Sequence, residues 1–387
     1  MEKTKIGIVG IGDISGIYLK NITTLFKEIE IVGVCDLIPE RAQSAVDEYG
    51  IKKAYKDMYE LFADPDVEVV LNLTRPYEHY DVTKAALLAG KHVYSEKPIA
   101  VDMDEATELV NLAKEKNLLI GGAPDTFLGA GIQTARKIID AGLIGDIVGA
   151  DCAMICHGHE TWHHDPEFYY KRGGGPMMDM GPYYVSALCN LLGEAKAVMG
   201  MTKKTFPTRL ITSQPFFGKV VDVDVDTHLT GCIEFSSGAI AQIITTFDVY
   251  YSTQARFEIY GTQGTIVVPD PNTFGGDVLL YRTEDVEKIT VDPGLRKAEA
   301  LTLYKGYKPM PLMFGYRNNS RALGLADMCK ALKTGREARA NYNLQLHVLE
   351  ILTSFSKSCA QRKYIELTTK YNRAAPMKNL AMPGVLD

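Results

Sequence analysis

Short apolar runs alternate with longer amphipathic stretches over the first 121 residues of the chain. A short apolar run is typical of a strand buried on both faces, whereas apolar residues three to four apart are typical of a helix packed on a sheet. The predicted strands are residues 5–10, 29–35, 67–73, 92–95 and 118–121, and the predicted helices are 17–22, 39–49, 58–63, 79–89 and 104–116. This order predicts an α/β fold with a doubly wound parallel sheet, which is the Rossmann arrangement.

The period of the apolar residues changes after Pro124. One helix is predicted over residues 132–141 and another ends at residue 192, while most later runs alternate apolar and polar positions. The strand-like runs are residues 146–156, 227–235, 239–247 and 255–260. Such alternation predicts an α+β domain whose largely antiparallel sheet has one buried face and one face open to a partner subunit. We therefore expect an N-terminal domain of residues 1–124 and a second domain of residues 125–387.

A glycine-rich turn joins the first strand to the first helix. Gly10, Gly12 and Ser15 form the pattern G-x-G-x-x-S, in which the first glycine permits a tight turn, the second lets the backbone approach a pyrophosphate, and the serine keeps the helix close to the strand. The helix N-terminus then offers N–H groups to the anion. Asp36 ends the second strand, where its carboxylate would bind a ribose 2′-hydroxyl and repel a 2′-phosphate, so NAD is predicted rather than NADP. The alternative for Asp36 is an exposed helix cap.

Polar residues also follow the other strands of the predicted parallel sheet. Ligands bind beyond the carboxyl ends of such strands, and Thr74, Arg75 and the tripeptide Glu96-Lys97-Pro98 lie at these ends. This position favours Lys97 as an acid or base over a surface lysine. His79 begins its helix and is either a cofactor contact or a solvated side chain. The residues expected to contact the cofactor are Gly10, Gly12, Asp13, Ile14, Ser15, Asp36, Thr74, Arg75, His79, Glu96 and Lys97.

The composition limits the kinds of partner. The chain has 387 residues, of which 46% are hydrophobic and 23% are charged, and its formal net charge is -6. An acidic chain without a long basic run argues against nucleic acid and membrane surfaces, so a small-molecule partner is predicted. Seven scattered cysteines do not have the spacing of a disulfide framework. With no signal-like N-terminus and no apolar stretch long enough to span a bilayer, a cytoplasmic protein is predicted.

Four of the eight histidines and the only tryptophan lie within residues 157–164. Zinc bound by His157, His159 and either His163 or His164 is one interpretation, although this spacing does not define the geometry of a site. We favour sugar recognition, in which Trp162 stacks on the apolar face of a ring while His157, His159 and His163 bond to its hydroxyls. An ordinary loop, a loop ordered by another subunit, and a moving lid are further alternatives. No metal is predicted, because hydride transfer to NAD needs none.

The order of these motifs resembles that of the glucose–fructose oxidoreductase, inositol dehydrogenase and rhizopine catabolism family, written Gfo/Idh/MocA. The resemblance covers nearly the whole chain and rests on residues 10–15, Asp36, Glu96-Lys97-Pro98 and the segments 173–181, 259–264 and 319–322. It implies an NAD(P)-dependent dehydrogenase of sugars, glycosides or cyclic polyols, with a Rossmann domain, an open-faced sheet, and a homodimeric or homotetrameric assembly. Fold alone is weak evidence of function, so the site residues must support it.

The resemblance also implies roles for particular side chains. The lysine of E-K-P carries over to Lys97 and the aspartate of D-x-G-x-H to Asp179, whereas Tyr183 stands where the histidine is usual and Ser186 stands where a further aspartate often follows. On a continuous helix Asp179 and Tyr183 would be one turn apart and face the same way, which suits binding two neighbouring hydroxyls of the substrate. A helix disturbed by Pro182 is the alternative. Asp179 and Tyr183 are therefore expected both to bind substrate and to assist catalysis.

The predicted reaction is the reversible oxidation of a secondary ring hydroxyl, with hydride passing to C4 of the nicotinamide while deprotonated Lys97 takes the hydroxyl proton. Asp179 is expected to orient the substrate or to relay a proton through Tyr183, and Glu96 to bond the cofactor ribose or the backbone. One alternative is an NAD-assisted, redox-neutral glycosidase, which oxidises C3, eliminates the leaving group, adds water and reduces the ketone again. A sugar-sensing regulator without catalysis is another.

Overall fold

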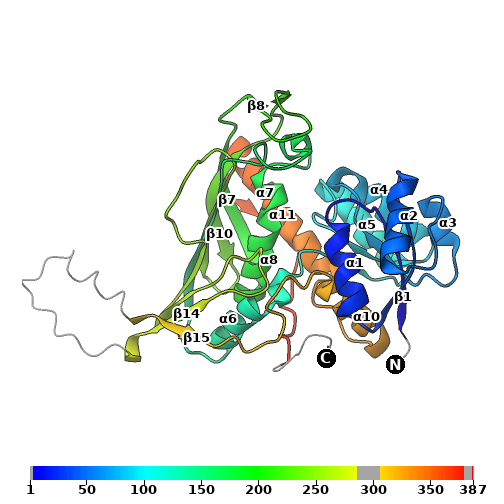
Figure 1. The fold of residues 1–387 in the computed structure, drawn as a ribbon. Coiled ribbons are helices and arrows are strands. Elements are labelled where there is room, and N and C mark those ends of the chain that lie inside the picture. The colour runs from blue at the N-terminus through cyan, green and yellow to red at the C-terminus, as the bar shows by residue number, and fades with distance from the viewer. Residues whose placement is uncertain (1–2, 286–305, 379–385, 387) are drawn as a thin grey trace, which may run out of the picture.

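The computed structural model describes residues 3–285, 306–378 and 386. Its N-terminal part is a parallel sheet of five strands in the order β2-β1-β3-β4-β5 (Figure 1). The strands are β1 (Thr4–Val9), β2 (Ile29–Cys35), β3 (Val69–Asn72), β4 (His92–Ser95) and β5 (Ile120–Gly122). The doubly wound parallel sheet predicted from the alternating runs is confirmed.

Helices cover both faces of this sheet because successive side chains of a strand point to opposite sides. In β1, Ile6 packs in one core with Tyr18, whereas Val9 packs in a second core with Leu61. Tyr18 belongs to α1 and Leu61 to α3, so the two cores lie under different helices. The helices are α1 (Ser15–Thr24), α2 (Pro39–Tyr49), α3 (Met58–Ala63), α4 (His79–Leu88) and α5 (Met103–Glu115).

A larger mixed sheet follows, with nine strands among the described residues in the order β15-β14-β13-β12-β6-β11-β10-β7-β16. Neighbouring strands are antiparallel except β6 and β11, which are parallel. The largely antiparallel sheet predicted from the alternation is therefore confirmed. The strands are β6 (Ile147–Ile155), β7 (Ala195–Lys203), β10 (His228–Phe235), β11 (Ile240–Thr246), β12 (Phe257–Gly261), β13 (Gly264–Val267), β14 (Val278–Arg282), β15 (Lys308–Met310) and β16 (Ile365–Glu366), while β8 (Thr208–Leu210) and β9 (Val220–Asp222) form a separate hairpin.

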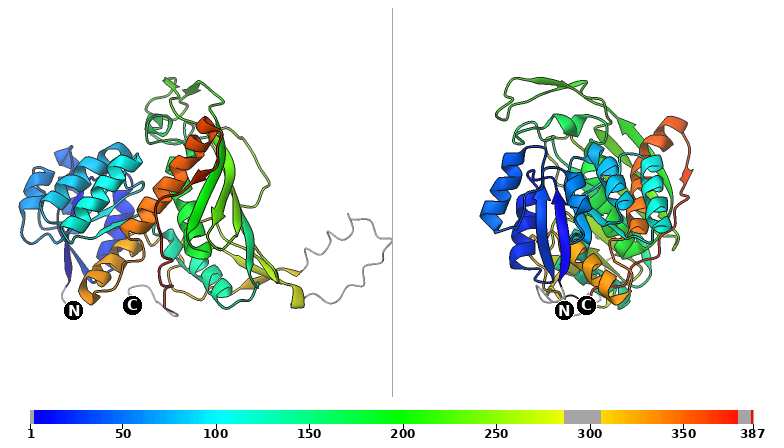
Figure 2. Two further views of the ribbon diagram at one scale, coloured as in Figure 1. Left: turned by 180° about the vertical axis from the view of Figure 1, so that it is seen from behind. Right: turned by 90° about the vertical axis from the view of Figure 1, so that its right-hand side faces the viewer.

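Helices lie along one face of the larger sheet (Figure 2). They are α6 (Ala130–Asp140), α7 (Pro176–Asp179), α8 (Gly181–Leu192) and α11 (Tyr342–Gln361). All twelve residues of α8 are buried, which explains why its sequence is apolar all round. The opposite face carries exposed apolar side chains, including Met199 and Met201 of β7 and Ile240 of β11.

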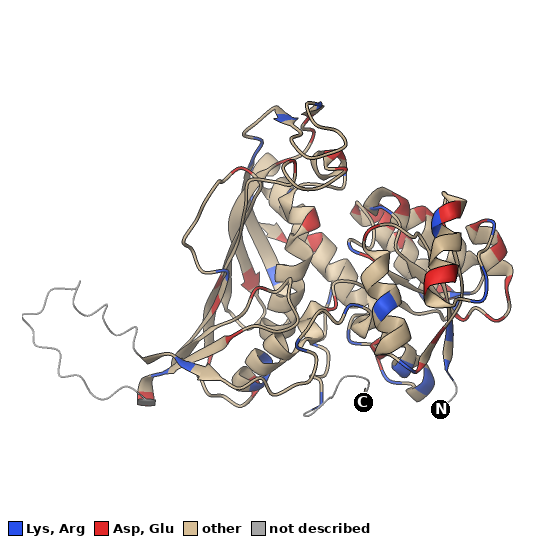
Figure 3. Ribbon diagram, viewed as in Figure 1, with Lys and Arg blue, Asp and Glu red and all other residues tan. Residues whose placement is uncertain are grey.

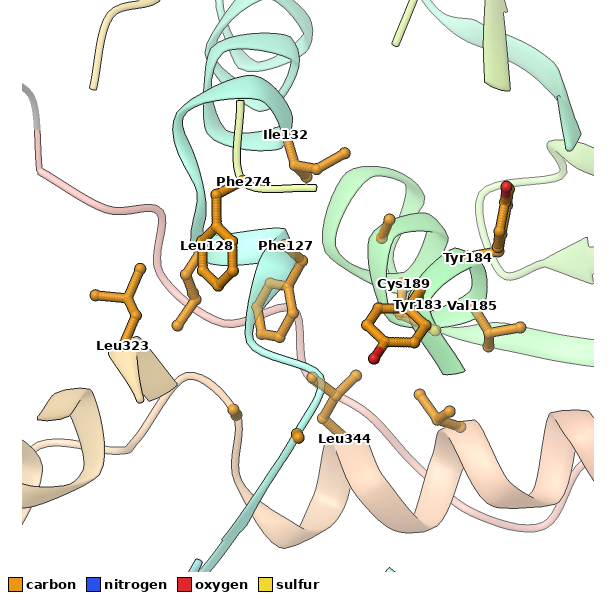
Figure 4. Close-up of a cluster of buried hydrophobic side chains, with 14 of the residues drawn as sticks. Phe127, Leu128, Ile132, Tyr183, Tyr184, Val185, Cys189, Phe274, Leu323 and Leu344 are labelled. Carbon is orange, nitrogen blue, oxygen red and sulfur yellow. The ribbon is translucent and has the colours of Figure 1, made fainter. Parts of the chain in front are cut away.

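The two sheets are joined by later parts of the chain. Helix α10 (Leu323–Thr334) packs on β5 of the first sheet, and a side chain added at Gly324 would collide with the hydroxyl of Tyr94. Figure 4 shows one core shared by Phe127, Leu323, Leu344 and Tyr183, which come from four different segments. The predicted domain boundary between residues 124 and 125 stays a prediction. Helices α10 and α11, which lie far beyond it in the sequence, also pack on the first sheet.

Charged side chains of both signs are interspersed over both sheets and their helices (Figure 3). Among the described helices, none combines the length and apolar character needed to cross a membrane. The seven cysteines are free thiols, and one of them, Cys232 on the open face of the larger sheet, is exposed.

Candidate active site

The glycine-rich turn between β1 and α1 has the geometry expected of a dinucleotide-binding loop. Gly10 has φ +95°, and a Cβ there would lie 2.9 Å from the backbone of Leu73, so only glycine fits. A Cβ on Gly12 would meet nothing within 4 Å, which leaves its backbone open to a ligand. Ser15 begins α1 and donates a hydrogen bond of 2.6 Å to the carbonyl of Gly12. Within the described residues no side chain caps α1 at Ile14, so its N-terminal N–H groups suit a pyrophosphate.

The other predicted cofactor residues lie at the carboxyl ends of the strands. Asp36 accepts backbone N–H groups of Ile11 and Ile38 at 2.7 and 2.8 Å. Thr74 is held through its hydroxyl and N–H by the amide oxygen of Asn72. Arg75 pairs with Asp165 of the second domain at 2.9 Å. Of these contacts, that of Asp36 with Ile11 reaches the glycine-rich turn, and the cofactor roles of all three residues stay predictions.

His79 and Glu96 are buried supports of the strand ends. The ring nitrogens of His79 lie 2.6 Å from the carbonyl of Pro98 and 2.9 Å from that of Thr74, and burial lowers the pKa of this ring. The alternative of a solvated His79 is therefore wrong. Glu96 accepts hydrogen bonds from the hydroxyl of Tyr18 at 2.7 Å and from the backbone N–H of Lys97 at 3.1 Å. Glu96 thereby ties α1 to the strand end that carries Lys97.

Lys97 and Asp179 come from different domains and form a buried ion pair. Lys97 follows β4, and its bond to Pro98 is cis. Its Nζ donates hydrogen bonds of 2.7 Å to both Oδ1 and the backbone carbonyl of Asp179, which ends α7. The two side chains are only 14% and 15% exposed. The structure therefore brings together the two residues that the motifs placed 82 positions apart.

Electrostatics hold this pair in its charged form. Burial opposes the charge on Lys97, but Asp179, Tyr183 and Glu96 outweigh it and raise the pKa of the lysine. Burial also opposes ionisation of Asp179, but Lys97 and His159 hold the pKa of its carboxyl well below the usual range. Lys97 is therefore an ammonium at neutral pH, and the predicted role of a deprotonated Lys97 requires a route by which its proton leaves.

Tyr183 reaches the same place from a separate helix. The continuous helix that would place Asp179 and Tyr183 on one side does not form, because α7 ends at Asp179 and α8 begins at Gly181, with Pro182 in its first turn, where a missing N–H is tolerated. The Nζ of Lys97 nevertheless lies 5.4 Å from the centroid of the Tyr183 ring. Figure 4 shows Tyr183 projecting from α8. Burial raises the pKa of its phenol, so Tyr183 is a neutral hydroxyl.

Two histidines of the histidine-rich loop lie in different places: His159 lies beside Asp179, whereas His157 does not. The Nε2 of His159 lies 3.3 Å from Oδ2 of Asp179. His157 instead stacks on Tyr250 with ring centroids 3.6 Å apart. Trp162 is 63% exposed and meets the edge of His159, which leaves its indole available for stacking. Sugar contacts by these three side chains stay predictions.

His163 and His164 lie near Asp13 of the glycine-rich turn between β1 and α1. Both face the carboxylate of Asp13, at 3.8 and 3.4 Å. The ligand atoms of these three residues lie within 4.8 Å of one another. However, Nδ1 of His163 accepts the N–H of Asp165, so Nε2 carries the hydrogen and points it at Asp13 instead of offering a lone pair to a metal. The His157 and His159 zinc arrangement also does not form, since their rings face different neighbours.

Two family models match this chain. Residues 4–122 match the family described as "Oxidoreductase family, NAD-binding Rossmann fold", and residues 132–267 match the "GFO/IDH/MocA C-terminal domain". The chain belongs to the Gfo/Idh/MocA oxidoreductase family. Its first domain is an NAD-binding Rossmann domain, and the glycine turn, the uncapped α1 and Asp36 fit that cofactor.

Similar proteins within this family act on polyols and sugars. The chain is 36% identical over 145 residues to an inositol 2-dehydrogenase/D-chiro-inositol 3-dehydrogenase of Lactiplantibacillus plantarum, but the match covers only 37% of this chain and 41% of that protein. It is 28% identical over 282 residues to a 1,5-anhydro-D-fructose reductase of Ensifer adhaerens, covering 71% and 79%. The crystal structure of an NAD binding oxidoreductase from Klebsiella pneumoniae superposes with a TM-score of 0.78 over 95% of this chain and 100% of that one, at 21% identity.

Two side chains of this Gfo/Idh/MocA site were not predicted to belong to it. Arg321 lies before α10, and its Nη2 is 3.4 Å from the hydroxyl of Tyr183 and 3.2 Å from Asn272. Tyr169 packs edge-on against His159 with centroids 4.2 Å apart. Segment 319–322, which contains Arg321, supports the family resemblance, and two tyrosines follow the histidine cluster. Neither pattern indicates which of these side chains points into the site.

Proposed function

We propose that the protein is an NAD-dependent dehydrogenase that oxidises a secondary ring hydroxyl of a sugar, glycoside or cyclic polyol. The observation that carries the proposal is the buried Lys97 and Asp179 pair at the carboxyl end of β4, beside an NAD-binding turn. The polyol and sugar relatives support the substrate class. NAD supplies the hydride acceptor, so the protein must position one hydroxyl of the substrate and supply a group that accepts its proton.

Lys97 is the residue proposed to exchange that proton. Its ammonium points at Asp179, and the ring of Tyr183 lies beside it, so a substrate oxygen near Nζ would be flanked by a carboxylate and a neutral phenol. In the direction of ketone reduction the ammonium donates a proton to the new hydroxyl. In the direction of oxidation the lysine must first release its proton. Asp179 and Tyr183 are proposed to bind neighbouring hydroxyls, with Arg321 fixing the phenol.

The open face of the larger sheet is proposed to pack on a second copy of the chain. Met199 and Met201 of β7 and Ile240 of β11 are each more than half exposed on the same face of this sheet. A group of exposed apolar side chains on one face is characteristic of an interaction surface. A homodimer or homotetramer built on this face would bury them.

The proposed activity is tested by incubating the protein with NAD and a panel of hexoses, inositols, sugar acids and glycosides. NADH absorbance and released aglycone are recorded together. We expect NADH to form with at least one ring alcohol. Aglycone release without net NADH would instead establish the redox-neutral glycosidase, and tight NAD binding without turnover across the panel would establish a regulator.

A further inference from the structure

The two carboxylate oxygens of Asp179 face two different side chains. Oδ1 accepts a hydrogen bond of 2.7 Å from Nζ of Lys97, and Oδ2 lies 3.3 Å from Nε2 of His159. The side chains of the three residues are 12% to 15% exposed. Charge-assisted hydrogen bonds usually measure about 2.7–2.9 Å, so the positive charge in this arrangement resides on Lys97.

The ring of His159 is held in this place by neighbours from several segments. The edges or faces of Tyr169, Phe247 and Trp162 surround it at centroid distances of 4.2, 4.7 and 5.1 Å. The preceding Gly158 has φ +91°, and a Cβ there would lie 2.3 Å from the hydroxyl of Tyr170. The chain can therefore turn toward Asp179 only with glycine at this position.

The loop that carries His159 is anchored by a buried charge network. Glu160 pairs with Arg209 at 2.9 Å, and Arg209 also pairs with Asp248. These side chains are 4% to 7% exposed. Such a network fixes a loop rather than allowing it to drift, because each charge would be costly to leave unpaired. The residue next to His159 is therefore anchored in the interior of the second domain.

The other groups near Lys97 cannot take up its proton at neutral pH. Burial raises the pKa of Tyr183 and of Tyr169, so both are already protonated. The guanidinium of Arg321 is a permanent cation. An imidazole is the side-chain class that exchanges a proton between about pH 5 and 8. The titratable groups nearest the His159 ring are Asp179, Tyr169 and His163, while the hydroxyl of Tyr170 accepts the backbone N–H of His159 and Lys97 lies beyond Asp179.

We propose that His159 takes up the proton that Lys97 must release before Lys97 can accept one from the substrate hydroxyl. This inference rests on the proposed dehydrogenase function. An Nζ–H bond of Lys97 breaks as an O–H bond forms at Oδ1 of Asp179. After a half-turn of the carboxyl group that O–H bond breaks, and an N–H bond forms at Nε2 of His159, which accepts the proton in the neutral tautomer whose ring hydrogen is on Nδ1. Lys97 is then an amine, Asp179 is again a carboxylate, and the total charge of the three groups is unchanged.

This transfer explains how a lysine held as an ammonium can begin an oxidation. The amine of Lys97 takes the hydroxyl proton while hydride leaves for NAD, and the imidazolium of His159 later releases its proton to solvent. His159 therefore acts through Asp179 and does not contact the substrate oxygen. Loss of the imidazole should slow oxidation at neutral pH far more than it changes cofactor binding.

The first test compares wild type with His159→Gln, using NAD and the best ring alcohol from the panel between pH 6 and 10. We expect kcat at pH 7 to fall about 100-fold, the rise of kcat with pH to move upward by more than one pH unit, and KM for NAD to change less than about threefold. The control is His228→Gln, whose ring bonds Thr246 on the larger sheet, and it should keep the wild-type profile. An unchanged rate and profile in His159→Gln would overturn the proposal for His159 alone.

The second test needs no turnover. Imidazole nitrogens are followed by nuclear magnetic resonance during a pH titration of protein without added NAD, and His159 is assigned by the signal missing in His159→Gln. We expect Asp179→Asn to lower the pH midpoint of His159 by at least about one unit, because the carboxylate stabilises the imidazolium. An unmoved midpoint would refute the coupling even if the dehydrogenase activity is established. A wild type inactive on the whole panel would refute the proposed function, while this titration would still test the coupling.

Discussion

Asp36 accepts the backbone N–H of Ile11 at 2.7 Å through Oδ2. Ile11 lies between the two glycines of the NAD-binding turn, and Asp36 ends β2. Oδ1 of the same carboxylate accepts the N–H of Ile38 at 2.8 Å. A carboxylate offers about four lone-pair sites, so Asp36 can hold the turn in shape and still accept hydrogen bonds from a ribose. The alternative of an exposed helix cap is wrong, because Asp36 is half-buried and the N-cap of α2 is Ile38, which has no side-chain cap.

Replacing Asp36 should change the preference between NAD and NADP. We expect Asp36→Ala to weaken NAD about 10- to 100-fold, since a hydrogen bond to a charged group contributes about 1.5–3 kcal/mol and the turn is also loosened. Asp36→Asn keeps one acceptor for Ile11 but loses the charge that repels a 2′-phosphate. Its ratio of NADP to NAD dissociation constants should fall at least about 10-fold in isothermal calorimetry. A ratio equal to that of wild type would show that Asp36 does not discriminate between a ribose 2′-hydroxyl and a 2′-phosphate.

The first sheet could be predicted because its signals are local. Each strand is a short apolar run, and each helix has its own period, so both appear within a few residues of sequence. The Gly10 turn is equally local, since one tight backbone approach to Leu73 requires glycine. Whether Pro182 breaks the helix could not be decided from the sequence, because this proline is compatible with either the first turn of a new helix or a distorted continuous one.

The composition of the site was less predictable because it depends on contacts between distant segments. Lys97 and Asp179 were found through motifs, but no pattern showed that His159 rather than His157 would face Asp179. Residues 157 and 159 share one side of an extended segment by spacing alone, and the turn at Gly158 separates them. Arg321 lies 138 residues from Tyr183, and only the packing of α10 on the first sheet brings them together.

Replacing Lys97 should separate its chemical role from its structural one. We expect Lys97→Met to lower kcat at least about 100-fold while the dissociation constant for NAD changes less than about threefold. The variant should also lose about 3 kcal/mol of unfolding free energy, because the buried carboxylate of Asp179 loses its main partner. Adding Asp179→Asn should recover most of that stability and none of the activity.

Two observations would contradict this assignment. A Lys97→Met variant that keeps more than half of the wild-type rate would exclude Lys97 from proton transfer. A double variant that regains activity together with stability would show that the pair is only structural. Lys84→Met is a suitable control, since Lys84 pairs with Glu108 on exposed helices of the same domain and should keep wild-type kcat.

A charge on the open face of the larger sheet should dissociate the proposed oligomer. Met199 is 58% exposed on β7 and lies opposite Cys232 of β10 on that face. Met199→Asp would place a carboxylate against apolar groups of the second copy, where it has no water and no partner. We expect sedimentation velocity to show a smaller species than wild type at micromolar concentration.

The control for this change is Leu88→Asp. Leu88 is also an exposed apolar residue, at 56%, but it ends α4 on the first domain. Its variant should sediment as wild type does. If Met199→Asp and wild type sediment alike, the subunits do not meet through this face.

Asp125 should make folding stability fall as the pH rises. Burial raises the pKa of its carboxyl to about 6, although the N–H of Gly324 and the charge of Arg321 act in the opposite direction. The unfolded chain has an aspartate pKa of about 3.9, so between these values the folded protein binds more protons than the unfolded chain. The contribution of Asp125 is therefore lost as pH rises through this window and stays constant above it.

Asp125→Asn removes this titration and keeps an oxygen for the N–H of Gly324, which Asp125 accepts at 2.9 Å. Between pH 5 and 8 the unfolding free energy of the variant should gain about 1.4 kcal/mol relative to wild type, as urea denaturation would measure. Gln345→Leu, which removes a buried hydrogen bond to the carbonyl of Gly122 and no titrating group, should show the same difference from wild type at both pH values. If the curves of Asp125→Asn and wild type run parallel, Asp125 is ionised without penalty, and Arg321 and Gly324 must compensate its burial fully.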